Sequence, residues 1–194
     1  MKKKIMSLLL SVLVAGSVQA QTTWVVDPVH SKVNFSIGHL VISEVDGTFK
    51  QFAGKMVTGK EDFTDAKIDF EVEAGSINTD NDQRDGHLRS EDFFYAEKYP
   101  KITFKSTAFE KTGSNNYVLK GNLTMRGITK PVRPEVRYGG QVVDGYGNTR
   151  AGFKVTGTLN RMDYGIAWND KTEHGSLIVG EEVEVQIKLE FIKQ

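Results

Sequence analysis

The side chains best suited to metal or acid–base chemistry are four histidines, and they are scattered along the chain: His30, His39, His87 and His174. No two of them have the helical or strand spacing that presents two imidazoles to one metal, although a composite site from distant segments stays open. The absence of cysteine excludes disulfides, thiolate nucleophiles and Cys-ligated zinc or iron–sulfur sites. We therefore expect no metal and no cofactor.

An acidic stretch from Asp80 to Asp92 has the composition of a calcium loop without its register. Such a loop needs glycine at its sixth position, whereas counting from Asp80 places Asp85 there, and Arg84 and Arg89 add positive charge. The chain also lacks GxSxG, HExxH and the glycine-rich phosphate-binding motifs. These absences argue against calcium binding and against the common enzyme classes.

Large aromatic residues are numerous, with 11 phenylalanines in 194 residues. Aromatic side chains ordinarily fill a core. However, a barrel whose interior is wider than its side chains can fill will hold a ligand. The composition is therefore compatible with either a solid core or a hollow one.

Alternation of apolar and polar residues is the dominant pattern, and it predicts half-buried strands. The alternating segments are 33–37, 68–72, 102–104, 117–125, 132–138, 153–159 and 183–191. Glycine- and asparagine-rich turns separate them, and the two segments that could hold a short helix are Thr79–Tyr99 and Asn169–Ser176. We predict one antiparallel all-β domain. Alternation alone does not distinguish a sandwich from a closed barrel.

The first twenty residues have the pattern of a secretory signal peptide: three lysines from Lys2 to Lys4, an apolar run, and the small-residue ending Val18-Gln19-Ala20. We predict cleavage after Ala20, which leaves residues 21–194 as one soluble periplasmic domain. The whole chain has 25 basic and 25 acidic residues, and loss of the three lysines makes the mature domain mildly acidic. Nucleic acid is therefore not an expected partner.

Several ordered segments together resemble the YceI-like family of exported, lipocalin-like, polyisoprenoid-binding proteins. The resemblance covers nearly the whole mature chain. Its segments are DPVHS at 27–31, VNF at 33–35, GTF at 47–49, FAG at 52–54, RDGHLRSEDFF at 84–94, YPKITFKS at 99–106, GNLTMRGITKP at 121–131, RMDYG at 161–165 and VGEEV at 179–183.

The resemblance implies an extended eight-stranded antiparallel lipocalin-like barrel with a short helical insertion. Its apolar lumen would hold a polyisoprenoid, such as a prenyl quinone or prenyl diphosphate, or a related amphiphilic lipid, without covalent chemistry. The expected wall residues are Val33, Phe35, Ile37, Phe49, Phe52, Phe70 and Phe104. The expected residues at the mouth are Arg84, His87, Leu88, Phe93, Phe94 and Arg126, with Arg161 as a further donor.

Alternatives to these roles stay open. Leu88, Phe93 and Phe94 are equally suited to plugging an open barrel end, and Arg161 is also suited to a surface ion pair with Asp163. A lipid-modifying enzyme of the same fold would use His87 as general base, oriented by Asp85 or Asp82.

A third alternative is an interaction module with a filled barrel, binding protein partners through loops such as 141–150. Transient membrane contact and a homodimer are also left open.

Overall fold

The computed structural model describes residues 21–170 and 177–194. The predicted signal peptide and most of the possible helix at Asn169–Ser176 therefore lie outside the described residues. The strands are β1 (Thr22–Val26), β2 (Lys32–His39), β3 (Ser43–Phe49), β4 (Phe52–Thr58), β5 (Lys67–Glu73), β6 (Ile77–Asn78), β7 (Lys101–Lys111), β8 (Asn116–Met125), β9 (Ile128–Val132), β10 (Glu135–Val143), β11 (Thr149–Asn160) and β12 (Val179–Lys193). The helices are α1 (Asp82–Arg89) and the short 3₁₀ turns η1 (Ala74–Ser76) and η2 (Arg161–Tyr164).

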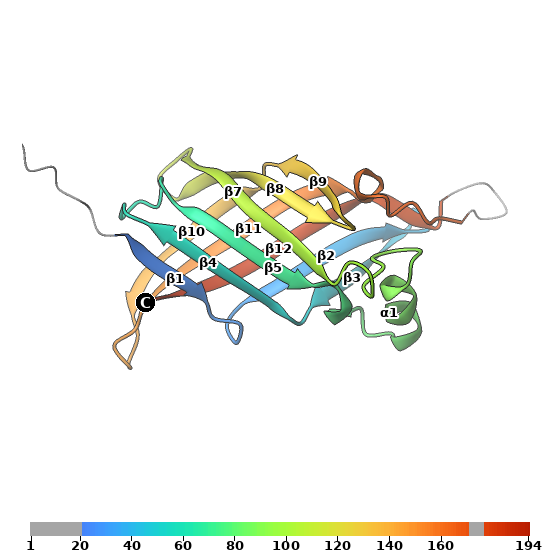
Figure 1. The fold of residues 1–194 in the computed structure, drawn as a ribbon, viewed down its shortest axis with the longest axis horizontal. Helices are drawn as coiled ribbons and strands as arrows, with labels where there is room; N and C mark the ends of the chain where they lie inside the picture. The colour runs from blue at the N-terminus through green and yellow to red at the C-terminus, as the bar shows by residue number, and fades with distance from the viewer. Residues whose placement is uncertain (1–20, 171–176) are drawn as a thin grey trace, which may run out of the picture.

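The strands form one antiparallel sheet that closes on itself (Figure 1). β1 pairs with β4 on one side and with β12 on the other, and the path around the barrel is β1-β4-β5-β7-β8-β10-β11-β12. This confirms the expected eight-stranded antiparallel barrel with one short helix. Its elongated body carries α1 at one end and the C-terminus at the other (Figure 1). In the described part of the chain, no helix is long and apolar enough to cross a bilayer.

The segment 132–138, which alternation predicts to be a single strand, is divided between β9 and β10. Pro131 and Pro134 have no N–H to donate to a neighbouring strand, which favours a break here. Among the residues that the structure describes, β9 pairs with β8 alone, whereas β10 pairs with both β8 and β11. The strand paired with this side of β8 therefore changes from β9 to β10 at Pro134.

Buried aromatic rings fill the barrel end away from α1. The β4–β5 loop carries Phe63 into this end, where its ring contacts Trp24, Tyr138 and Phe153 at centroid separations of 5.8, 5.5 and 5.3 Å. The Tyr117 hydroxyl donates to the Asp62 carbonyl and holds the loop in place. Since Phe63 is 2% exposed, we call this the plugged end.

Local polar residues determine where α1 begins and ends. The Asn81 side chain accepts from the Arg84 N–H, as an N-cap does, and the Ser90 hydroxyl donates to the His87 carbonyl at the other end. Asp82 lies in the first turn, where the helix dipole favours negative charge. The helix covers the barrel end opposite the plugged one (Figure 1).

Candidate functional site: two adjoining cavities in the barrel

Two cavities lie inside the barrel. The first, of about 640 Å³, is bounded by α1, β2, β3 and β12, and we call it the α1-end cavity. The second, of about 620 Å³, extends from the middle of the barrel towards the plugged end, and we call it the central cavity. Both are bounded by the side chains of Val33, Phe49, Ile102, Met125, Leu159 and Val185, so they adjoin. A barrel filled by its own side chains, the third alternative above, does not describe this interior.

Most of the residues predicted from the sequence border these cavities. Those at the α1-end cavity are Val33, Phe35, Ile37, Phe49, Arg84, His87, Leu88, Phe93 and Phe94. Those at the central cavity are Val33, Phe49, Phe70 and Phe104.

Two of the predicted site residues, Phe52 and Arg126, line neither cavity. The Phe52 ring stacks on Phe70 at 6.0 Å, and of these two rings Phe70 borders the central cavity. The Arg126 guanidinium donates to the carbonyls of Glu91 and Phe93, and it ties the segment after α1 to the β8–β9 turn. Its role in the structure is to hold this segment against the barrel.

Glycines on neighbouring strands let phenylalanine rings lie flat against the cavity wall. Phe35 is paired with Gly47 across β2 and β3, and a Cβ added to Gly47 would be 2.2 Å from the Phe35 ring. Likewise, a Cβ on Gly121 would be 2.3 Å from the ring of Phe104. Because these rings occupy the space of an absent side chain, the centre of the barrel stays open.

Polar groups at the α1-end cavity are held by contacts within the α1 region. Arg84 donates from Nε to the Thr79 hydroxyl and from Nη2 to the Thr79 carbonyl, both at 2.7 Å. Asp85, which is 1% exposed, accepts from the N–H and the hydroxyl of the same threonine at 2.9 and 2.6 Å. Thr79 thus links both residues, and Asp85 acts as an anchor for the helix.

His87 has a different partner from the one proposed for catalysis. Its Nε2 lies 2.9 Å from Oδ2 of Asp92, whereas Asp85 is bonded to Thr79. The His87 ring packs edge-on against Phe93 and Trp168, at centroid separations of 5.0 and 4.9 Å. The expectation that Asp85 or Asp82 orients this histidine is therefore wrong, because α1 directs Asp85 towards Thr79 and the following loop brings Asp92 to the ring.

Arg161 is buried and bound to the main chain, not paired with Asp163. Its Nε donates to the Gly180 carbonyl, and its Nη1 donates to the carbonyls of Ile166 and Trp168 at 2.6 and 2.8 Å. Burial lowers the pKa of this guanidinium. Asp163 lies instead 3.9 Å from Nζ of Lys130. The expected Arg161–Asp163 ion pair is thus replaced by two separate contacts, and Arg161 organises the loop that walls the cavity.

Comparison with known proteins shows the family to which this chain belongs. Residues 24–191 match the YceI-like domain. The chain belongs to this family. It is 38% identical over 165 residues to protein YceI of Escherichia coli O157:H7, covering 85% of this chain and 83% of the relative. A YceI-like crystal structure from Campylobacter jejuni has a TM-score of 0.69 at 30% identity, covering 81% of this chain and 90% of that one.

A more distant solved structure shows the same fold. It is the polyisoprenoid binding domain from Saccharophagus degradans, with a TM-score of 0.68 at 14% identity, covering 88% of this chain and 98% of that one. At this identity the likeness concerns the fold.

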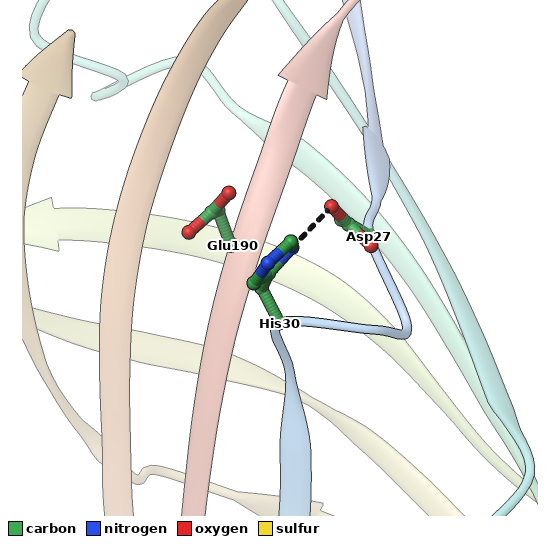
Figure 2. Close-up of side chains that lie close together, drawn as sticks. All are labelled: Asp27, His30 and Glu190. Carbon is green, nitrogen blue, oxygen red and sulfur yellow. Dashed lines mark hydrogen bonds and ion pairs between the residues drawn. The ribbon is translucent and has the colours of Figure 1, made fainter. Parts of the chain in front are cut away.

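One further cluster of possible ligands in this YceI-like chain lies outside the cavities. Asp27, His30 and Glu190 place one ligand atom each within 4.8 Å of one another, and Asp27 is hydrogen-bonded to His30 (Figure 2). Nη1 of Arg150 lies 2.7 Å from Oδ2 of Asp27 and 2.5 Å from Oε1 of Glu190. The guanidinium therefore already supplies the cation that these carboxylates require.

The sequence analysis missed the contribution of residues 164–168 to the site. Tyr164 borders the central cavity, and Ile166 and Trp168 border the α1-end cavity. This segment has no alternation, and it runs from the last residue of η2 towards β12, so a strand pattern does not find it. The available signal was RMDYG at 161–165, whose arginine orients the whole segment.

Proposed function

We propose that this YceI-like protein is an exported, non-catalytic binding protein that holds a polyisoprenoid or related amphiphilic lipid inside its barrel. The observation that carries the proposal is the pair of adjoining, mainly apolar cavities. Such concave apolar spaces with few polar groups are typical of sites for small apolar ligands. The polyisoprenoid binding domain of Saccharophagus degradans, which has the same fold, supports the choice of ligand class.

The energetics favour a long hydrocarbon chain. Burial of each methylene contributes about 0.8 kcal/mol against water, so several isoprene units offset the cost of ordering the chain. Transfer from a bilayer is close to neutral, since lipid tails are as apolar as the cavity wall. The polar groups beside α1, including Arg84 and His87, would then contact the head group and determine which lipid is selected.

Extraction of the protein purified from its own host tests the proposal. Native mass spectrometry should show a bound long-chain lipid, and organic extraction should release it. A folded protein that carries no lipid, and that takes up no ubiquinone-10 from detergent micelles, would overturn the proposal.

A matched pair of variants tests which surface binds. Phe35→Asp places a charge at the α1-end cavity, whereas Gln186→Asp places one on the outer face of the neighbouring strand β12, where Gln186 is exposed and borders neither cavity. Quinone uptake should fall at least about tenfold in the first variant, because a charge cannot be buried without a partner, and stay unchanged in the second. Circular dichroism checks that both are folded.

We also propose that residues 1–20 direct export and are removed. The lysine-rich start and the small residues before Gln21 support this. N-terminal sequencing of the protein from the periplasmic fraction should begin at Gln21. An uncleaved chain retained in the cytoplasm would contradict it.

A further inference from the structure

The barrel wall has a lateral split beside β9. β11 pairs with β10 as far as Thr156, opposite Glu135, and its remaining residues up to Asn160 pair with β12. β9 pairs with β8, and within the described residues no strand pairing joins β9 to β11. We call the boundary between 128–134 and 157–164 the β9–β11 split.

The split leads directly to the central cavity. Lys130, Arg133 and Pro134 border this cavity from one side of the split, and Thr158, Asn160 and Asp163 border it from the other. Pro134 lies beside Gly157 across the split. An ion pair between Lys130 and Asp163, at 3.9 Å, also bridges the two sides. Its side chains are 46% and 61% exposed, and ion pairs exposed to this degree contribute little to stability. Opening the split therefore breaks no strand ladder.

The rim of the split combines positive charge with exposed apolar side chains. On the β9 side, residues 128–134 carry Lys130 and Arg133 and no aspartate or glutamate, and the acidic residue across the split is Asp163. Ile128 on one side and Met162 on the other are 38% and 41% exposed. Basic residues beside apolar ones suit an anionic phospholipid surface, where the cations meet the head groups and the apolar side chains reach the acyl boundary.

We propose that the β9–β11 split is a lateral entrance to the central cavity and that its rim docks on an anionic phospholipid bilayer. This rests on the proposed lipid-binding function. A lateral entrance lets the hydrocarbon chain pass from the bilayer directly into the barrel. The transfer then avoids a state in which the whole chain is exposed to water, which is unfavourable. Separation of Lys130 from Asp163 opens the route.

Reversible cross-linking tests the entrance, because the chain has no cysteine of its own. In a Lys130→Cys, Asp163→Cys variant, a short bifunctional methanethiosulfonate reagent bridges the split, and a reductant releases it. The control is Thr124→Cys, Thr129→Cys, since these residues are paired within the β8–β9 hairpin and do not bridge the split. Mass spectrometry verifies each cross-link, and circular dichroism verifies the fold.

The readout is uptake of ubiquinone-10 from phosphatidylcholine–phosphatidylglycerol vesicles. Bridging the split should slow uptake at least about tenfold, as expected for a blocked gate, and reduction should restore it. Bridging the hairpin should leave the rate unchanged. Equal uptake by the bridged and reduced forms would overturn the entrance.

Charge removal tests the docking surface independently. A Lys130→Gln, Arg133→Gln variant should take up quinone about tenfold more slowly than the wild type from the anionic vesicles, with no such difference from pure phosphatidylcholine. Equal rates from the anionic vesicles, or an equal loss from both vesicle types, would overturn docking on anionic lipid.

The two proposals fail in different ways. If the wild type takes up no ubiquinone-10 even from detergent micelles, lipid binding itself is wrong. If it binds quinone from micelles but takes up none from vesicles, the bilayer entrance is wrong and lipid binding stands.

Discussion

At the scale of single residues, the open lumen depends on glycines, which leave space for the aromatic rings beside them. Phe35 borders the α1-end cavity, yet its ring lies against the wall because Gly47 on the next strand has no side chain. Sheets commonly use aromatic side chains to cover glycine in this way. The same pairing therefore serves both packing and the volume left for a ligand.

Gly47→Ala should reduce the α1-end cavity. The added Cβ would stand 2.2 Å from the Phe35 ring, so the ring must move towards the lumen. We expect a loss of about 1–3 kcal/mol of stability, typical of overpacking, together with weaker lipid binding. Urea unfolding and quinone titration measure both. Gly152→Ala is the control, because its Cβ would meet nothing within 4 Å, and equal behaviour of the two variants would contradict the prediction.

Arg150 is a second important residue, because its ion pairs hold together segments that are distant in the sequence. Hydrogen bonds from His30 and Arg150 hold the pKa of the Asp27 carboxyl well below its usual range. A hydrogen bond from Arg150 does the same for Asp144. These contacts raise the pKa of the guanidinium further above its ordinary value. The network joins the β1–β2 connection to β11 and β12.

The network predicts acid sensitivity with a definite sign. Since the folded-state pKa values of Asp27 and Asp144 lie below the unfolded value of about 3.9, their stabilisation is present above about pH 4. It is lost as the pH falls through the folded values. The Tm should therefore decrease between about pH 5 and pH 2.

Arg150→Met should lower the Tm at neutral pH and flatten this acid dependence, because the carboxylates lose their cation. Lys101→Met is the control, since the ion pairs of that lysine with Glu71 and Glu73 are exposed to solvent. Differential scanning calorimetry across the pH range measures the change. An acid profile of Arg150→Met identical to that of the wild type would rule out this role of the network.

At the scale of elements, the β4–β5 loop closes the plugged end. Phe63 has a positive φ of 60°, an uncommon conformation for a bulky residue. The loop is fixed by Asp65, which accepts from the Thr58 hydroxyl and from the N–H groups of Gly59 and Lys60. The first of these contacts is the main cause of the lowered pKa of Asp65. The loop is thus held in the shape that inserts the ring.

Phe63→Ala should destabilise the protein by about 3–5 kcal/mol, because it removes a ring that is packed on all sides. Phe104→Ala should cost less, since Phe104 borders the central cavity and has fewer contacts to lose. Guanidinium unfolding compares the two. If Phe104→Ala were the more costly change, the description of a solid plugged end and a hollow centre would be incorrect.

At the scale of the whole molecule, binding and stability are coupled through the hollow interior. An unfilled lumen forgoes packing contacts, and a bound chain supplies them. A ligand that binds only the folded state stabilises it by about 2.7 kcal/mol at a free concentration one hundred times Kd.

The Tm should therefore rise with quinone concentration. Differential scanning calorimetry in detergent micelles with and without ubiquinone-10 measures this. The Phe35→Asp variant should show a much smaller rise. An unchanged Tm at saturating quinone would mean that the ligand does not occupy the folded interior.

Much of the architecture could be predicted because its signals are local. Alternation marks which residues share a strand face, since side chains of a pleated strand point to opposite sides in turn. The Asn81 cap and the acidic first turn place α1 within Thr79–Tyr99, as expected. The ordered motifs indicated the closed barrel that alternation alone left undecided.

The site could be predicted only in part, because its contacts depend on geometry between segments. Nothing near His87 distinguishes Asp85 from Asp92 as its partner. The direction of each carboxylate is decided by the turn of α1 and the loop after it. In the same way, Arg161 was expected to pair with nearby Asp163, and its actual acceptors are carbonyls of segments that the loop brings around it.

The alternation of residues and the ordered motifs thus determined the strands, their inward faces and the family. Tertiary structure alone decided the two cavities, the break in the wall beside β9 and the network around Arg150. Arg150 and Asp27 are 123 positions apart and meet only when the barrel closes. The physical reason is that alternation is a property of a few consecutive residues, whereas empty space and ion pairs depend on which distant surfaces face each other after folding.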